Sequence, residues 1–218
     1  MGKKYISRDS SSVRMFKSDF LEALSKVHYL VPVYLYLPVI GFCFYLALDH
    51  STSFKTWIIF GFLGIVIWSL VEYLMHRFIF HYKAKTVWGK RLHFIMHGVH
   101  HDYPNDAHRL VMPPSVSIPL AVLFYFFFRL FINRPELEVF YGFFLAGYLI
   151  YDLGHYAIHH CRIKHPIIKA IKKNHMQHHF MNENRGFGVS SSLWDKLLDT
   201  SFYKGPDPTD PFYEDLKR

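Results

Sequence analysis

The chain alternates long apolar segments with polar segments that are rich in histidine. Residues 31–48 contain no charged side chain in 18 positions, and residues 56–75 contain one, Glu72. About 20 helical residues cross the hydrocarbon core of a bilayer, so both segments are predicted to be transmembrane helices. Residues 116–128 and 139–151 are shorter apolar runs of 13 each, a length that also suits a buried helix. We predict an all-α integral membrane protein with four spans; a soluble bundle of four buried helices is the alternative.

Basic residues follow the ends of these apolar segments. Lys and Arg are dense before the first segment, between the second and third, and after the fourth, whereas the connections 49–55 and 133–138 carry one each, Lys55 and Arg134. By the positive-inside rule, both termini and all the histidine clusters are predicted to face the cytoplasm. The net charge of +8 therefore reflects membrane topology. It forms no single stripe, so no nucleic-acid partner is predicted.

The order of the segments predicts two helical hairpins. Pro135, within Asn-Arg-Pro-Glu, favours a turn between the third and fourth spans. Two histidine clusters precede this second hairpin and two follow it, so they meet only if the chain returns to the same side of the membrane. We expect a basic cytosolic segment at 1–30, the membrane domain at 31–204 and a Pro- and Asp-rich tail at 205–218. No cleavable signal peptide is recognised at the start.

Ten of the 16 histidines fall into four clusters at the ends of these spans. Imidazole is the commonest metal ligand in proteins, and ten are too many for one ion and about right for two. We therefore predict a two-metal site at the membrane surface. Its candidate ligands are His76, His81, His97, His100, His101, His155, His159, His175, His178 and His179.

The spacing within the clusters supports shared metal binding. His155 and His159 are four apart and share one face of a helix. The sequences HGVHH and HMQHH repeat this spacing, and each adds a histidine next to the last one. Adjacent positions of a helix point about 100° apart around its axis, so the two neighbouring histidines can bind different metals. His76 and His81 are five apart, or about 140° on a regular helix. We predict that the helix ends or bulges between them.

The remaining histidines are interpreted as surface or core residues. His160 directly follows His159 and is left out, because the pair four apart already occupies that helix face. The others are His28, His50, His93, His108 and His165.

Several polar side chains are candidates to support the metals or the substrate. Glu72 lies four residues before His76, and Asp152 three before His155, so each is a candidate acceptor for an imidazole N–H. A helix-end charge reaching toward water is the alternative for both. We also predict that Tyr148 and Asp152 line the substrate entrance. Further candidate partners are Asp102, Asn174 and Asp195.

The motifs of several common enzyme classes are missing. The chain has no HExxH, GxSxG, P-loop or GxGxxG sequence. An all-histidine pair of metals at a membrane surface indicates iron that activates dioxygen against an aliphatic substrate from the bilayer. A metal transporter is the alternative from another class. Transporters place their ligands near the bilayer midplane, whereas these histidines lie at the ends of spans.

The segments EYLMHRFIFH, LHFIMHGVHH, RLVMPP, GYLIYDLGHY, HMQHHF and GFGVSSSLWD resemble the fatty acid 2-hydroxylase branch of the membrane fatty acid hydroxylase superfamily. The resemblance runs in order from about residue 68 to residue 200. The histidine clusters alone indicate only the superfamily, which includes sterol desaturases and carotenoid hydroxylases. RLVMPP and GFGVSSSLWD favour the 2-hydroxylase branch, and a sterol-type desaturase or hydroxylase is the alternative.

The resemblance implies four transmembrane helices, a cytosolic helical cap and two metals bound by the ten histidines. It implies insertion of one oxygen atom from O2 at carbon 2 of a long-chain fatty acid or a sphingolipid acyl chain. Free acid, thioester and ceramide remain open as substrates. Iron is expected for activity, and zinc is an alternative in the purified protein. Arg109, or the basic side chains Lys172 and Lys173, are candidates to hold a polar head group; solvated or lipid-facing charges are the alternative.

The electron source and the compartment are further expectations from the resemblance. Many eukaryotic members begin with a fused haem domain, and residues 1–30 are too short for one. We therefore expect electrons from a separate cytochrome or ferredoxin. The bacterial inner membrane and the endoplasmic reticulum both remain open as locations.

Overall fold

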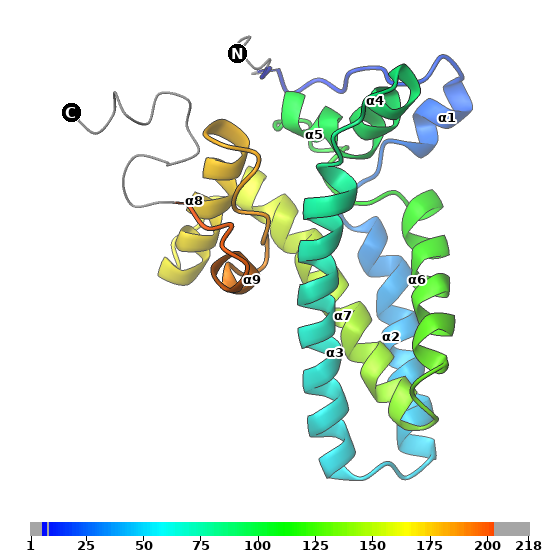
Figure 1. The fold of residues 1–218 in the computed structure, drawn as a ribbon. Helices are drawn as coiled ribbons and strands as arrows, with labels where there is room; N and C mark the ends of the chain where they lie inside the picture. The colour runs from blue at the N-terminus through cyan, green and yellow to red at the C-terminus, as the bar shows by residue number, and fades with distance from the viewer. Residues whose placement is uncertain (1–5, 8, 203–218) are drawn as a thin grey trace, which may run out of the picture.

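The computed structural model describes residues 6, 7 and 9–202, and over these residues it is all-helical, without strands. The predicted tail at 205–218 and the first part of the segment 1–30 lie outside the described residues. Figure 1 shows a bundle of long helices with shorter helices gathered at one end. The bundle contains α2 (Val31–Asp49), α3 (Phe54–Leu74), α6 (Pro114–Arg129) and α7 (Glu136–His160).

Three of the helical segments are long and apolar enough to cross a membrane. They are Val31–Asp49, Phe54–Phe80 and Glu136–His160. The second combines α3 with a π-helical turn, η1 (Met75–Phe80), that directly follows it. The fourth expected span, α6, has 16 residues and would measure about 24 Å at the usual helical rise. It is therefore shorter than the roughly 30 Å hydrocarbon core.

Helix α7 is the centre of the bundle and packs against α2, α3 and α6. Small residues let the helices approach closely, as is common between helices in membranes. A methyl group added at Gly64 of α3 would meet the backbone of α7 at Phe140, and one added at Gly147 of α7 would lie 2.8 Å from the Trp68 ring. The centre is filled by aromatic rings, with Trp68 5.3 Å from both Phe144 and Tyr148.

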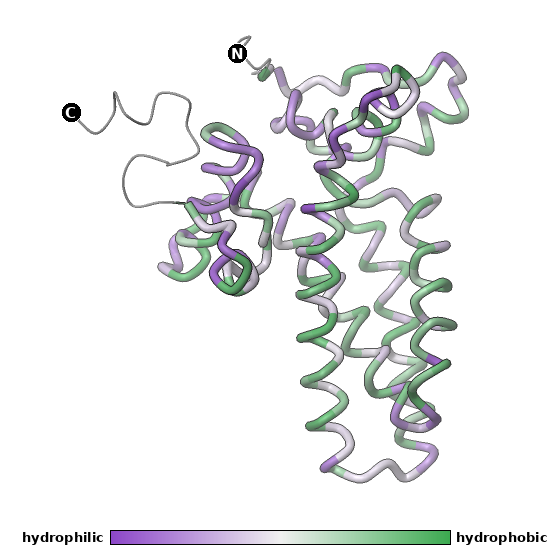
Figure 2. Tube along the Cα trace, viewed as in Figure 1, coloured by the Kyte–Doolittle hydropathy of each residue, from purple (hydrophilic) through white to green (hydrophobic). Residues whose placement is uncertain are grey.

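The outer faces of the bundle are apolar rather than polar. Phe42 on α2, Phe62 on α3 and Phe126 on α6 are each 60% or more exposed. Figure 2 shows hydrophobic positions along the long helices and many hydrophilic positions among the short helices at one end of the bundle. Contiguous exposed apolar surface of this kind is suited to lipid rather than to water.

The short helices form a polar cap in two parts (Figure 1). One part follows α7 and contains α8 (Pro166–Phe180) and α9 (Leu193–Leu197). The other part contains α1 (Asp19–Leu24), α4 (Val87–His93), the π-helical turn η2 (Phe94–Gly98) and α5 (Val99–Asp102). The histidines lie where the two parts of the cap meet the bundle.

Candidate metal centre

The structure brings the ten clustered histidines into two groups of five. Within each group, one ring nitrogen from every histidine lies within 4.8 Å of the others. Eight of the ten side chains are buried, and His81 and His159 are half-buried. Group A contains His76, His81, His97, His101 and His178. Group B contains His100, His155, His159, His175 and His179.

The local backbone explains how His76 and His81 reach the same group. The predicted bulge between them is confirmed: Met75–Phe80 is a π-helical turn, and the N–H of His81 donates to the carbonyl oxygen of His76 at 3.1 Å. The wider turn brings positions five apart onto one face, so their Nε2 atoms are 3.2 Å apart. π-helical turns are rare and occur frequently at functional sites.

Adjacent histidines separate into different groups. His100 belongs to group B and His101 to group A, and His178 belongs to group A and His179 to group B. This follows from the rotation of about 100° between neighbouring positions of a helix. Pairs four apart share a group instead, as with His155 and His159. The two short helices α5 and α8 therefore each contribute to both groups.

Two histidines of group A donate to backbone carbonyls. Nδ1 of His76 lies 2.5 Å from the oxygen of Phe187, and Nδ1 of His178 lies 2.8 Å from the oxygen of Arg185. A carbonyl only accepts, so each Nδ1 carries the proton and each neutral ring keeps a lone pair on Nε2. Both lone pairs point at Nε2 of His81, at 3.2 and 2.9 Å. His81 has at most one proton on Nε2 and can donate to only one of them, so at least one of these two close nitrogen–nitrogen contacts has no proton between the atoms.

Group B presents the same crowding of lone pairs. Nε2 of His175 lies 2.9–3.0 Å from Nε2 of His155, His159 and His179. One N–H can satisfy at most one of these contacts. His100 is also buried, with neither ring nitrogen hydrogen-bonded. Converging lone pairs and orphaned buried nitrogens are relieved by a cation, so both groups fit a metal ion.

Burial keeps these imidazoles neutral. It lowers the pKa of His97, His100 and His175 well below the usual value, and the neighbouring imidazoles lower it further. The neutral ring is the form that ligates a metal. The electrostatics of the cap therefore favour metal binding over protonation.

The sequence predicted that Glu72 accepts a hydrogen bond from His76. In the structure Glu72 instead holds a loop, and that loop contacts His76. Its carboxylate accepts from the N–H groups of Val189 and Ser190 at 2.8 and 2.7 Å, and from the Ser190 hydroxyl at 2.6 Å. This loop, residues 185–190, also supplies the carbonyl of Phe187 that accepts from His76. The carboxylate therefore acts on the histidine through the backbone. Spacing along one helix could not reveal a partner that lies more than a hundred residues away.

Asp195, on α9, holds the same loop from the other side. Its side chain is 0% exposed and accepts from the N–H groups of Phe187 and Gly188 at 2.8 and 2.9 Å. Asn174 donates to the carbonyl oxygen of Gly188 at 3.4 Å. Loop 185–190 is thus anchored by two buried carboxylates and an amide. Asp102, at the end of α5, is half-buried, and its backbone oxygen accepts from the N–H of Ser7 at 2.7 Å.

Asp152 lines an apolar cavity rather than bonding to His155. It accepts from the N–H of Met112 at 3.2 Å and from the Tyr148 hydroxyl at 3.1 Å. Tyr148 is not among the residues that line this cavity and faces a smaller one of about 30 Å³. That Tyr148 and Asp152 line the substrate entrance stays a prediction. Tyr151, which the sequence analysis did not select, takes the lining position.

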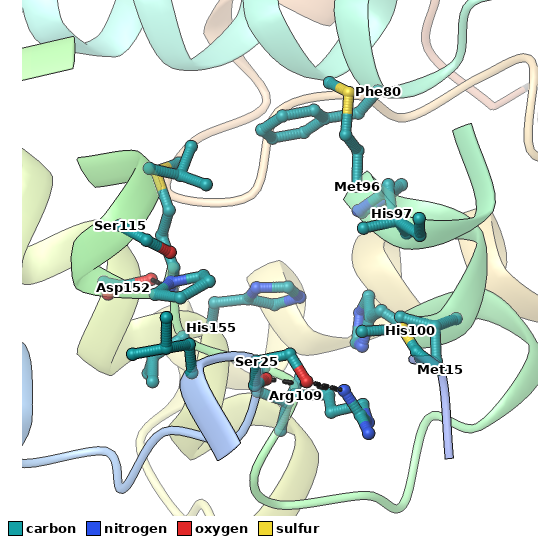
Figure 3. A pocket seen from close by; sticks show the side chains of 18 of the residues that line it. Met15, Ser25, Phe80, Met96, His97, His100, Arg109, Ser115, Asp152 and His155 are labelled. Atoms are coloured by element: carbon teal, nitrogen blue, oxygen red, sulfur yellow. Dashed lines mark hydrogen bonds between the residues drawn. The ribbon is translucent and has the colours of Figure 1, made fainter. Parts of the chain in front are cut away.

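The cavity that Asp152 lines has a volume of about 260 Å³, and we call it the main cavity because it touches both histidine groups (Figure 3). His97 of group A and His100 and His155 of group B are on its wall. The rest of the lining is largely apolar, with Met, Leu, Val and Ile side chains. An apolar chain in this cavity would place one carbon beside both groups.

A buried ion-pair network beside this cavity was not predicted. Arg109 binds Glu22 at 2.7 Å and Asp106 at 3.3 Å. The guanidinium group is therefore paired with carboxylates of the chain, and the prediction that it holds a head group stays a prediction. Lys172 donates to the carbonyl oxygen of Cys161 at 3.5 Å.

The histidines outside the clusters remain outside both groups. His160 is exposed, and its ring packs at 4.9 Å from Tyr156. None of His28, His50, His93, His108 and His165 belongs to either group.

The fold and the site define a membrane protein whose histidine clusters fit a metal-binding site. The family model described as fatty acid hydroxylase matches residues 61–200, and the chain belongs to the fatty acid hydroxylase family. This match covers both histidine groups and loop 185–190.

Individual relatives agree with this assignment. The chain is 38% identical to the dihydroceramide fatty acyl 2-hydroxylase FAH1 of Arabidopsis thaliana, over 86% of this chain and 79% of that protein. It is 35% identical to the fatty acid 2-hydroxylase of Rattus norvegicus, over 90% of this chain and 58% of that protein. It is 36% identical to the ceramide very long chain fatty acid hydroxylase SCS7 of Saccharomyces cerevisiae, over 87% of this chain and 49% of that protein.

A solved structure has the same fold. It is full-length scs7p, in which only the hydroxylase domain is visible, and it superposes with a TM-score of 0.80 at 32% identity. The match covers 85% of this chain and 70% of that chain.

Proposed function

We propose that the chain is a membrane-bound fatty acid 2-hydroxylase, which inserts one oxygen atom from O2 at carbon 2 of a long-chain fatty acid or a sphingolipid acyl chain. The main support is the apolar cavity that touches both histidine groups. The relatives named as fatty acid and dihydroceramide 2-hydroxylases support the substrate class. The sterol-type and transporter alternatives have no comparable support.

The ten histidines are proposed to hold two metal ions, one in each group. Bound iron would supply the redox chemistry that activates dioxygen. The residues of the chain position and insulate that chemistry. The Phe187 and Arg185 carbonyls fix the tautomers of His76 and His178, so that both Nε2 lone pairs face the centre of group A. The apolar cavity wall orients the acyl chain and excludes water.

We propose four spans in two hairpins, with α6 as the shortest, and with residues 31–204 as the membrane domain. The apolar exposed face of α6, including Val122, Leu123 and Phe126, supports a lipid-facing helix. The basic segment at 1–30 and the tail at 205–218 are proposed to lie with the histidines on the cytoplasmic side, because Lys and Arg are concentrated there in the sequence. A separate cytochrome or ferredoxin as electron donor stays a prediction. The bacterial inner membrane and the endoplasmic reticulum both stay open as locations.

Expression in a host that lacks 2-hydroxylated lipids tests this function. Total lipid is hydrolysed, and the position of any new hydroxyl group is determined by mass spectrometry beside a His175→Ala variant. We expect 2-hydroxy fatty acids with the native chain and none with the variant. A metal-loaded native protein that is supplied with an electron donor and hydroxylates only another position, or only a sterol, would contradict the proposal.

A further inference from the structure

The N-terminal segment at 13–25 forms one wall of the main cavity. Five of its side chains line the cavity: Met15, Phe16, Leu21, Leu24 and Ser25. Figure 3 shows Met15 beside His100 and Ser25 beside Arg109. Met15 is buried, whereas Leu21 and Leu24 are 47% and 44% exposed. The segment therefore reaches from the interior of the cavity to its outer rim. We call residues 13–25 the gate segment.

One buried side chain holds the gate segment at three points. The Arg109 side chain is 2% exposed and donates to the Val13 carbonyl at 2.6 Å, to the Glu22 carboxylate at 2.7 Å and to the Ser25 hydroxyl at 2.8 Å. Asp106 pairs with the same guanidinium at 3.3 Å. Because Arg109 also lines the cavity, the attachment lies directly beside the space that would hold the substrate.

Glu22 completes the attachment from the gate segment itself. Its second carboxylate oxygen accepts from the N–H groups of Met15 and Phe16 at 2.9 and 3.1 Å. The only helix in the segment, α1, has six residues. A short element held by a few strong polar contacts opens locally more easily than a packed core helix.

The outer surface of the gate segment is suited to lipid. Phe20 is 71% exposed, and with Leu21 and Leu24 it presents an apolar face. Val116, an exposed residue at the start of α6, lines the same cavity. Exposed apolar residues of the gate segment and of α6 therefore both line this cavity, and α6 also exposes Val122, Leu123 and Phe126.

We propose that the gate segment opens and closes a lipid entrance, through which an acyl lipid passes from the bilayer into the cavity between Leu24 and Val116. Arg109 is the positioning residue that holds the gate segment in the closed position. This inference rests on the proposed function for its substrate, an acyl chain. Closure keeps water from the histidine groups while the chain is bound, and opening admits or releases the lipid.

The first test measures opening without measuring hydroxylation. Val111, 3% exposed and on the cavity wall, is replaced in a Cys161→Ser background, and the labelling rate of Val111→Cys by a water-soluble maleimide is recorded. Glu22→Gln is then added. An amide has one acceptor oxygen in place of two, so it cannot serve both Arg109 and the Met15 and Phe16 N–H groups.

We expect Glu22→Gln to raise this labelling rate about tenfold, the equivalent of one lost charge-assisted hydrogen bond. The matched control is Lys26→Gln, which removes the exposed partner of the same Glu22, at 3.2 Å, and should leave the rate unchanged. Cys43, buried in the bundle, reports general loosening and should stay unreactive. An unchanged rate at Val111→Cys, or an equal rise at Cys43, would overturn the proposal.

The second test asks whether the gate must move for turnover. Leu24→Cys and Val116→Cys are joined across the mouth by a reducible bifunctional thiol reagent. The same protein is assayed for hydroxylation of membrane lipid before and after reduction. We expect at least a tenfold loss when joined and recovery when reduced. Full turnover by the joined protein contradicts the gate. If the native chain hydroxylates nothing, the proposed function fails, and the labelling rates still decide whether the segment opens.

Discussion

The two histidine groups contain five histidines each but differ in the contacts that hold those histidines in place. Group A depends on loop 185–190, whose carbonyls accept from His76 and His178 and whose own N–H groups are held by Glu72 and Asp195. Group B draws two of its five histidines from the last turns of α7, where a regular helix alone places His155 beside His159. One site is therefore positioned by long-range contacts and the other mainly by helical periodicity. Perturbations of the loop and of the helix should separate them.

The largest effect is expected from removing a histidine of either group. His178→Ala and His155→Ala should each reduce the metal content from two ions per chain to one. Each should lower hydroxylation by more than about 100-fold, because loss of an outer hydrogen-bond partner alone costs about 10- to 100-fold. Metal analysis and product assays check this. His160→Ala is the control, since His160 is exposed and outside both groups, and it should retain both metals. Full metal content in His178→Ala would remove that residue from the site.

A smaller and selective effect is expected from Asp195→Asn. The amide has one acceptor oxygen and can serve either Phe187 or Gly188, so loop 185–190 loses an anchor. Metal affinity at group A should fall about tenfold, with group B unchanged. A titration with metal would then show one weakened site of two. Asp199→Asn, at an exposed position with φ of 53° that Asn tolerates, should leave both sites intact. Equal weakening of both sites would contradict the division into two supports.

Alanine substitutions at two glycines, one in loop 185–190 and one in α7, should change the stability of the protein in opposite directions. A Cβ at Gly188 would lie 2.9 Å from Asp195 Oδ2 and closer still to the Ser191 carbonyl, so Gly188→Ala should lower the free energy of unfolding by about 1–3 kcal/mol. A Cβ at Gly154 of α7 meets nothing within 4 Å, so Gly154→Ala should raise it by about 0.5–1 kcal/mol. Thermal unfolding in detergent measures both. Similar shifts in the two variants would show that the loop is not tightly packed.

The smallest effect concerns the gate segment and pH. Burial raises the pKa of Glu22, but the N–H donors of Met15 and Phe16, together with Lys26 and Arg109, lower it to about 2, from 4.5 in the unfolded chain. Its contribution to closure is therefore complete above about pH 4.5 and is lost only as the pH falls toward 2. The labelling rate at Val111→Cys, corrected for thiolate fraction, should be constant from pH 8 to pH 5. A rise within that range would mean that another group controls closure.

The contrast also explains what the sequence could and could not predict. Spacing identified all ten histidines that the structure brings together, and it predicted the bulge between His76 and His81, because helix geometry is a local property. Neighbours such as His100 and His101 were expected to diverge, and they lie in different groups. The loop partners of Glu72 and the gate-segment partners of Arg109 lie 84 or more residues away along the chain. Such contacts depend on the tertiary fold, which one sequence does not reveal.

The most direct test of the proposed chemistry is the source of the inserted oxygen. Cells that express the native chain are grown under dioxygen enriched in the heavy isotope, and the 2-hydroxy fatty acids are analysed by mass spectrometry. We expect the new hydroxyl group to carry the heavy isotope and the product to be absent with His175→Ala. A hydroxyl group that carries oxygen from water, or a product that persists in the variant, would contradict a dioxygen-dependent metal site built from these histidines.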